Sequence, residues 1–283
     1  MIDFDPVTQD NPKADSKYSS SLSPAVFISG GSKVLGTMFI TSGEGLHPTV
    51  LLLTGFPGNE VNYDIAHMLQ RQGFNVFTFY SRGSWGSEGV FSWKNLIDDT
   101  PAALTFLKSD FCKEKFQVDK NKIVFAGYSM GGFSALFNSI QLDNIKNVCA
   151  IAPFNMGMFG QLLTINEEIK NVTTEKMLRT KDFINCPSPE KLYDEMILHK
   201  TDWNLINHTK TLSQKNLLII SAKYDTTAPV ELHHKPLIGA LKLANSNVKE
   251  FILESGHSFS DKRIQLMRLI SDWISKINFL EKE

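Results

Sequence analysis

One short motif constrains both the fold and the chemistry of this chain. The sequence G-Y-S-M-G at 127–131 follows the apolar, β-branched run 122–126 and precedes the helix-forming stretch 132–137. A strand that turns into a helix within so few residues places Ser129 at the apex of a strained turn. The flanking glycines let the strand and helix approach closely. This context predicts a nucleophile elbow, whereas the five letters alone also fit a glycine-rich turn with an ordinary serine.

Apolar runs alternate with helix-forming stretches along the rest of the chain. The predicted strands are 25–29, 34–41, 49–54, 75–80, 122–126, 147–152, 216–222 and 248–254. The predicted helices are 60–72, 94–109, 130–141, 229–244 and 261–278. The first two strands, with Gly30 and Gly31 between them, are expected to form an antiparallel hairpin. Continuous apolar strands that alternate with helices predict a mostly parallel, eight-stranded sheet flanked by helices, and so an α/β fold.

One long segment lacks this alternation. Residues 155–210 contain helical patterns and no convincing strand, and such a length is unusual for a plain crossover connection. We predict a helical cap inserted after the sixth strand, with an enlarged crossover as the alternative. The expected domains are a loose N-terminal lead-in at 1–24, a core made of 25–154 and 211–283, and the cap at 155–210.

Composition and charge narrow the range of partners. The chain has 283 residues, of which 42% are hydrophobic, and a formal net charge of −1. No basic patch indicates nucleic acid, and no apolar stretch has the length of a membrane span. The three cysteines, Cys112, Cys149 and Cys186, are scattered without metal-ligand spacing, which favours reduced thiols. The acidic start of the chain lacks the features of a signal peptide, so a cytoplasmic location is expected.

A nucleophilic serine needs a histidine base and a carboxylate that orients it. In strand–turn–helix folds with this motif, the chain order is serine, acid, histidine. Asp225 follows the apolar run 216–222, and His257 follows the last predicted strand, so both are expected at the same edge of the sheet as Ser129. Individually, Asp225 also suits a turn before Pro229.

Other histidines are weaker candidates for the base. His47, His199 and His208 are expected to be surface residues, as His257 could be if it were considered alone. His233 and His234 follow Asp225 on a predicted helix rather than the last strand. The order of Ser129, Asp225 and His257, each at the end of a strand, therefore favours His257.

Two glycine-containing loops complete the predicted site. The strand that ends in T-G-F-P-G at 54–58 is expected to supply an oxyanion donor, and the backbone N–H groups of Phe56 and Met130 are the candidates. The loop R-G-S-W-G-S-E-G at 82–89 follows the next strand. Arg82 is expected to anchor this loop through polar contacts, with substrate binding as the alternative.

These motifs together resemble the α/β-hydrolase superfamily. The resemblance rests on 54–58, 82–89, 127–132, the strand end at Asp225 and G-H-S-F-S-D at 256–261, and it covers about residues 25–283 apart from the cap. Within the superfamily, the chain is similar to feruloyl-esterase-like carboxylesterases, dienelactone hydrolases and the catalytic domains of prolyl-oligopeptidase-type peptidases. Many relatives have histidine where this chain has Thr54, which bears on the geometry of the loop rather than on the class of reaction.

The resemblance implies a serine hydrolase that cleaves acyl or aryl-acyl esters and needs neither a metal nor an organic cofactor. A small-molecule ester or acyl compound is the expected substrate. An aminopeptidase, a thioesterase or an acyltransferase could use the same triad, and a non-catalytic binding protein is the alternative of another class. An aminopeptidase needs an acidic subsite for the substrate amine, and the candidates for that subsite are Glu88, Glu167 and Glu168.

The substrate pocket is the least constrained part of the prediction. The side chains expected to line it are Tyr128, Met156, Met158, Phe159 and Leu162. The last four lie at the apolar start of the cap, where they suit an acyl or aromatic group. Alternatively, these side chains only hold the cap to the core.

Overall fold

The computed structural model describes residues 4–12 and 15–279, so parts of the predicted lead-in and the last four residues lie outside it. Eight strands form one sheet in the order β1-β2-β4-β3-β5-β6-β7-β8. The strands are β1 Ser21–Ser29, β2 Ser32–Ile40, β3 His47–Leu53, β4 Asn75–Phe79, β5 Val118–Tyr128, β6 Asn147–Ile151, β7 Asn216–Ala222 and β8 Lys249–Leu253. Strand β2 is antiparallel to β1 and β4, and all the other neighbouring pairs are parallel. The predicted mostly parallel sheet of eight strands is confirmed.

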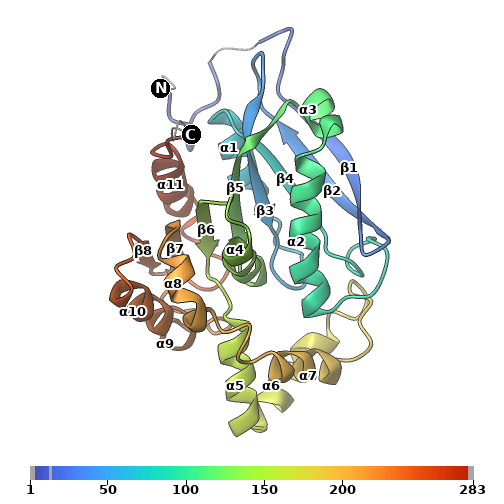
Figure 1. Cartoon of the computed structure of the whole chain (residues 1–283), viewed down its shortest axis with the longest axis vertical. Helices are drawn as coiled ribbons and strands as arrows, with labels where there is room; N and C mark the ends of the chain where they lie inside the picture. The colour runs from blue at the N-terminus through green and yellow to red at the C-terminus, as the bar shows by residue number, and fades with distance from the viewer. Residues whose placement is uncertain (1–3, 13–14, 280–283) are drawn as a thin grey trace.

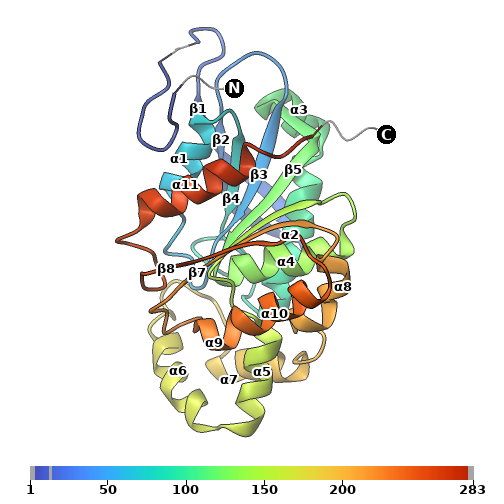
Figure 2. The ribbon, with the colours of Figure 1, turned by 90° about the vertical axis from the view of Figure 1, so that its left-hand side faces the viewer.

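Helices cover both faces of the sheet, as Figures 1 and 2 show. Helices α1 (Tyr63–Arg71) and α11 (Arg263–Ile274) pack on one face. Helices α2 (Trp93–Leu107), α3 (Asp110–Phe116), α4 (Met130–Gln141) and α10 (Lys235–Leu243) lie on the other. The central strands are buried on both faces, which explains their continuous apolar sequences. The result is two separate apolar cores, one on each side of the sheet.

The structure differs from the prediction in one predicted helix and in one helix that was not predicted. The prediction of one helix at 229–244 is wrong, because the chain forms α9 (Val230–His233) and then α10. Pro236 lies at the start of α10 and has no N–H to continue a helix from α9. The sequence reasoning also missed α3, whose N-terminus is capped by Ser109 Oγ accepting from the backbone N–H of Cys112 at 3.3 Å.

The segment before β1 makes specific contacts with the core. Strand β1 begins at Ser21, within the predicted lead-in. Nearer the N-terminus, both Asp5 carboxylate oxygens accept from Arg268 on α11, and Pro6 O accepts from Arg71 on α1. The side chain of Val7 is buried in the core beneath α1 and α11. The lead-in is thus attached around residues 5–7.

Residues 155–210 form helices beyond the carboxyl ends of the strands (Figure 1). These elements are α5 Met156–Ile165, α6 Glu168–Leu178, α7 Pro189–Leu198, the 3-10 helix η1 Leu205–His208 and α8 Thr209–Leu212. Helix α5 approaches α7 so closely that a Cβ on Gly160 would lie 2.2 Å from Met196 O. Helix α7 is attached to the core by Glu195, which accepts from the first backbone N–H groups of α2 at Trp93 and Lys94.

Candidate active site

Ser129 lies between β5 and α4 in a backbone conformation that few side chains adopt, with φ 56° and ψ −115°. Its flanking glycines explain how this turn is possible. A Cβ on Gly127 would lie 2.2 Å from Gly131 O, and a Cβ on Gly131 would lie 2.3 Å from Leu53 O on β3. Neither position has space for a larger residue, so the sequence holds the strained serine at the apex of the turn.

The three predicted catalytic side chains form one continuous chain of hydrogen bonds. His257 Nδ1 lies 2.6 Å from Asp225 Oδ2, and His257 Nε2 lies 3.0 Å from Ser129 Oγ. An ionised carboxylate only accepts hydrogen bonds, so the imidazole carries its proton on Nδ1. The Ser129 hydroxyl therefore donates to Nε2. Strand ends that are far apart in the sequence bring the three residues together, because parallel strands end at the same edge of the sheet.

The carboxylate of Asp225 is held in place and kept ionised. Its Oδ1 accepts the backbone N–H groups of Thr227 and Ala228, both at 2.8 Å, which fixes the loop after β7. Burial raises the pKa of Asp225, but the hydrogen bond from His257 and the two backbone donors outweigh burial and leave that pKa below its ordinary value. The carboxylate can therefore stabilise a protonated His257.

The two expected oxyanion donors also lie at the site. Phe56 and Met130 both line the cavity that contains Ser129. Among the hydrogen bonds of the described residues, neither backbone N–H has an acceptor. The loop that carries Phe56 is close to the elbow, since a Cβ on Gly55 would lie 3.1 Å from Ser129 Cβ. Trp85 Nε1 donates to Pro57 O in the same loop at 2.7 Å.

Ser129 opens onto a cavity of about 460 Å³ between the sheet edge and residues 155–210. Most of its lining is apolar, and the polar groups are hydroxyls and one histidine. The lining residues are Phe56, Pro57, Trp93, Ser129, Met130, Phe154, Phe159, Leu162, Ile169, Thr173, Met177, Thr180, Met196, Thr226, Thr227, Pro229, Leu232 and His233. No acidic residue is among these described lining residues.

The structure divides the five side chains that were expected in the pocket. Phe159 and Leu162 line the cavity. Met156 does not, because its side chain is fully buried in the core, and Met158 on the same helix does not line it either. Tyr128 also lies outside the cavity, where its ring packs 5.0 Å from the ring of His257. These three expectations need correction: only one side of α5 faces the cavity, and Tyr128 at the end of β5 is buried in the other core.

Several lining residues were missed by the sequence reasoning. Phe154 and the pair Thr226 and Thr227 follow the ends of β6 and β7, so their position at the catalytic edge was a usable signal. Trp93 and Met196 reach the cavity from α2 and α7. Nothing in their local sequence indicates this, because their position depends on how residues 155–210 pack on the core.

The loop 82–89 is anchored by Arg82, as predicted. Arg82 Nε donates to Asp99 Oδ1 at 2.5 Å, and the Arg82 backbone N–H donates to Asp99 Oδ2 at 2.8 Å. Ser29 Oγ also donates to Asp99, whose side chain is completely buried. Burial raises the pKa of Asp99, while these hydrogen bonds oppose that effect. Arg82 and Asp99 tie the loop to β1 and α2, and neither residue lines the cavity that contains Ser129.

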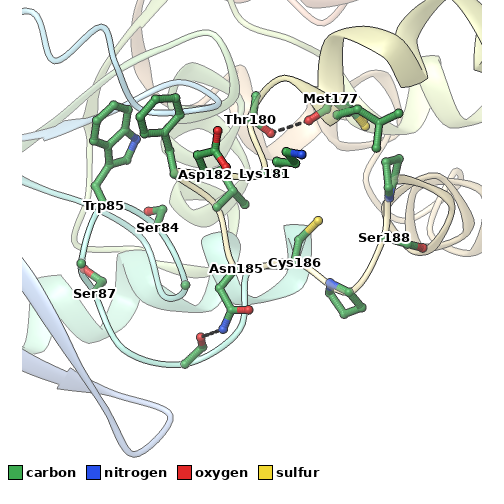
Figure 3. Close-up of a pocket in the computed structure, with 18 of the residues that line it drawn as sticks. Ser84, Trp85, Ser87, Met177, Thr180, Lys181, Asp182, Asn185, Cys186 and Ser188 are labelled. Atoms are coloured by element: carbon green, nitrogen blue, oxygen red, sulfur yellow. Dashed lines mark hydrogen bonds between the residues drawn. The ribbon is translucent and has the colours of Figure 1, made fainter.

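A second, more polar cavity of about 850 Å³ lies between the loop 82–89 and residues 177–190 (Figure 3). The ring of Trp85 stacks on Phe183 with centroids 4.6 Å apart, and Asn185 Nδ2 donates to Gly89 O at 2.8 Å. Glu88 lines this cavity, whereas Ser129 does not. Cys186 is also part of its lining, and burial raises the pKa of that thiol.

Neither of the weaker candidates for the base contacts Ser129 among the described interactions. His234 lies between Ser221 and Glu250, at 2.9 Å from Ser221 Oγ and 3.0 Å from Glu250 Oε2. His233 accepts a backbone hydrogen bond from Asn155. No group of His, Cys, Asp and Glu among the described residues could hold a metal ion.

Comparison with known proteins supports the fold more strongly than the function. No family model matches the chain. The uncharacterized protein YfhR of Salmonella typhimurium is 32% identical over 94 residues, which cover 33% of this chain and 30% of that protein. The matched stretch is therefore less than a third of either protein.

Solved structures match over nearly the whole chain. They include acylaminoacyl peptidase of Pyrococcus horikoshii (TM-score 0.67, 14% identity, 93% of this chain and 43% of that one). The esterase Pf2001 of Pyrococcus furiosus has a TM-score of 0.65 and 17% identity, with 95% and 99% of the two chains covered. The alpha/beta hydrolase GrgF of a Penicillium species has a TM-score of 0.67 and 18% identity, and the match covers 90% of this chain and 98% of that one. The chain therefore has the α/β-hydrolase fold, as its motifs indicated. No helix among the described residues is long and apolar enough to cross a membrane.

Proposed function

We propose that this chain is a serine hydrolase that cleaves carboxylic esters with an apolar acyl group. The observation that carries the proposal is the hydrogen-bonded array of Ser129, His257 and Asp225 at the mouth of an apolar cavity. In the proposed reaction, Ser129 Oγ attacks the ester carbonyl while His257 Nε2 takes its proton. Asp225 keeps the proton of the imidazole on Nδ1 and stabilises the imidazolium that forms.

The backbone N–H groups of Phe56 and Met130 are proposed to stabilise, by hydrogen bonds, the negative charge that develops on the carbonyl oxygen. Preorganised donors of this kind act most strongly in a site that excludes water. The tetrahedral intermediate collapses when His257 gives its proton to the alcohol, which leaves an acyl group on Ser129. A water that is deprotonated by His257 then releases the acid. No step requires a metal or an organic cofactor.

The lining of the cavity favours a neutral acyl group over a substrate with a free amine. An aminopeptidase needs a carboxylate near Ser129 to bind the ammonium group of the substrate. None of the three glutamates considered lies among the described residues that line the cavity: Glu88 lines the polar cavity, and Glu167 and Glu168 are exposed. The esterase Pf2001, a structural neighbour of matching length, supports the same choice. Thioester hydrolysis and acyl transfer use the same geometry, and the substrate screen separates thioesters from esters.

Residues 155–210 are proposed to act as a cap that sets acyl-group preference. The cavity has walls from both parts of the chain: Ser129 and Met130 from the core, and Phe159, Leu162 and Met177 from the segment. A bound acyl group would thus lie between the two. The largest acyl group that the cavity admits would depend on how closely residues 155–210 pack against the core.

The test is labelling by a fluorophosphonate together with a substrate screen. We expect covalent labelling of wild-type protein and of a Ser221→Ala control, and none of Ser129→Ala. The screen compares p-nitrophenyl esters of increasing length, hydroxycinnamate esters, acyl-CoA thioesters and aminoacyl anilides. Labelling that persists in Ser129→Ala, or turnover of anilides but not esters, would contradict the proposal.

A further inference from the structure

His233 is a buried histidine at the wall of the catalytic cavity. It ends α9, eight residues after Asp225, and is one of the residues that line the cavity containing Ser129. Only 2% of the residue is exposed. Its ring packs against Phe154 with centroids 4.4 Å apart, and Phe154 N donates to Ser129 O at 3.1 Å. His233 is thus held against the residues that follow β6, the strand next to β5.

The backbone determines which nitrogen of His233 carries the proton. The N–H of Asn155 donates to His233 Nδ1 at 3.0 Å, so Nδ1 has no proton of its own. Asn155 is itself held by its side chain, whose Oδ1 accepts the Leu205 N–H at 3.3 Å. The neutral ring must then carry its proton on Nε2. That nitrogen is buried and has no hydrogen-bond partner among the described residues.

The free N–H of His233 stays uncharged across the physiological range. Burial lowers the pKa of His233 to about 3, against an opposing effect from the charge of Asp225. The imidazole is therefore a fixed neutral donor and does not compete with His257 for the proton of Ser129. A buried donor without an acceptor is unfavourable, so a substrate oxygen placed against it would gain a hydrogen bond.

We propose that His233 Nε2–H donates a hydrogen bond to an oxygen on the acyl chain of the substrate. The preferred substrates are then esters of oxo-, hydroxy- or ether-containing acyl groups, rather than of plain alkanoic acids. This inference rests on the proposed ester hydrolysis and defines its substrate class. The rest of the cavity is apolar apart from hydroxyls, so a single acceptor in an otherwise apolar acyl chain matches its lining.

Two substitutions separate the proposed donor from the structural role of the same ring. His233→Asn places an amide oxygen near the position of Nδ1, where it can still accept from Asn155, and removes the Nε2 donor. His233→Gln reaches further and places an amide N–H near the position of Nε2, while it loses the acceptor for Asn155. A purely structural histidine predicts that Asn is the milder change for every substrate. A donor to the substrate predicts that only Asn removes the preference for oxygen-containing acyl groups.

The measurement is kcat/KM for p-nitrophenyl octanoate and for its 4-, 5- and 6-oxo analogues. We expect wild-type protein to prefer at least one oxo ester by about 10-fold over octanoate, the size of one buried hydrogen bond. His233→Asn should lose this ratio, whatever its effect on kcat/KM for octanoate, and His233→Gln should keep most of the ratio. Thermal melting of each variant checks folding.

A binding measurement keeps this test separate from the test of hydrolysis. Octanamide and its three oxo analogues are titrated calorimetrically into Ser129→Ala, with and without His233→Asn. Tighter binding of an oxo amide that disappears with His233→Asn supports the inference even if no ester is cleaved, in which case only the proposed function fails. The inference would be overturned if wild-type protein had equal kcat/KM for oxo and plain esters, or if His233→Asn kept the preference for oxo chains. A water molecule bound to Nε2 in place of the substrate would give the first of these results.

Discussion

The molecule contains two arrays in which a histidine joins a serine hydroxyl to a carboxylate. In the first, His257 lies 3.0 Å from Ser129 Oγ and 2.6 Å from Asp225 Oδ2. In the second, His234 lies 2.9 Å from Ser221 Oγ and 3.0 Å from Glu250 Oε2, with the two ring nitrogens exchanged. Each serine can donate to an imidazole whose other nitrogen donates to a carboxylate. By hydrogen-bond connectivity alone, the arrays are equivalent.

Their surroundings differ in every other respect that matters for acyl transfer. Ser129 stands in a strained turn, at φ 56°, where a helix begins. Ser221 lies within β7, a strand paired with β8. Ser129 lines a cavity of about 460 Å³, whereas Ser221 lines neither of the large cavities. Only the first serine therefore has space for a substrate and backbone donors beside it.

The comparison shows that hydrogen bonds among three side chains do not by themselves define an active site. Burial of the second array lowers the pKa of His234, with the charge of Glu250 opposing it, so that imidazole stays neutral and holds β7, β8 and α10 together. The first array lies at a strand edge where a substrate can reach it. Recognition of a catalytic serine thus needs the elbow and the cavity as well as the triad.

Removing the two serines should give the largest contrast. Ser129→Ala should lower kcat by roughly 10⁴–10⁶-fold with little change in stability, since only the nucleophile is lost. Ser221→Ala should leave kcat within about 3-fold and lower the free energy of unfolding by about 1–3 kcal/mol, because His234 Nδ1 loses its donor. Steady-state kinetics and urea melts on both variants measure this. A larger loss of kcat in Ser221→Ala would reverse the assignment.

Removing the charge of each carboxylate should give the next largest contrast. In Asp225→Asn the amide favours the wrong tautomer of His257, so kcat should fall by roughly 10⁴-fold. Glu250→Gln keeps an oxygen that accepts from His234 Nε2, so kcat should stay within about 3-fold. The comparison of kcat for the two variants is the measurement. Near-normal turnover by folded Asp225→Asn would mean that another group orients the base.

The side chains of α5 give a smaller and more local test. Trimming Phe159 or Leu162 to Ala should shift relative kcat/KM between short and bulky esters by up to about 3 kcal/mol, because both line the cavity. Met156→Leu is the matched control from the same helix: its side chain is buried away from the cavity, so it should change melting temperature without altering the substrate ranking. An unaltered ranking in both trimmed variants would mean that these residues only hold the segment to the core.

The sequence determined the elbow, the strands and the order of the triad because each depends on local patterns. Ser129, Asp225 and His257 each follow an apolar strand, and parallel strands place their ends together without further information. The break between α9 and α10 was less visible, although Pro236 marked it.

The pocket could not be predicted to the same degree because it lies between segments far apart in the chain. Met156 and Phe159 are three residues apart on α5, yet one is in the core and the other lines the cavity. Their difference depends on contacts of α5 with residues 203–204 and α7, where Gly157 and Gly160 allow close packing. Helical periodicity gives the apolar residues of α5 but not what each of them faces.

The smallest expected effect is the pH dependence of stability that arises from buried His233. This imidazole stays neutral in the folded protein, whereas His257 must gain a proton during the proposed reaction. In the unfolded chain a histidine binds a proton below about pH 6.5, whereas in the folded protein burial lowers the pKa of His233 to about 3. Between these values the unfolded state holds the extra proton, so the free energy of unfolding falls as pH falls. At pH 5 the loss from this residue is about 2 kcal/mol relative to pH 7.

His233→Asn removes this group while an amide oxygen remains near Nδ1 to accept from Asn155. We therefore expect the free energy of unfolding of His233→Asn to fall less than that of wild-type protein between pH 7 and 5, by about 2 kcal/mol. Urea melts of both proteins at pH 7, 6 and 5 measure the difference, and the contribution of His234 cancels because both proteins retain it. Parallel pH dependences for the two proteins would show that the pKa of His233 is nearly the same in the folded and unfolded states. His233 would then become charged as the pH falls to 5, unlike the neutral donor proposed for the cavity.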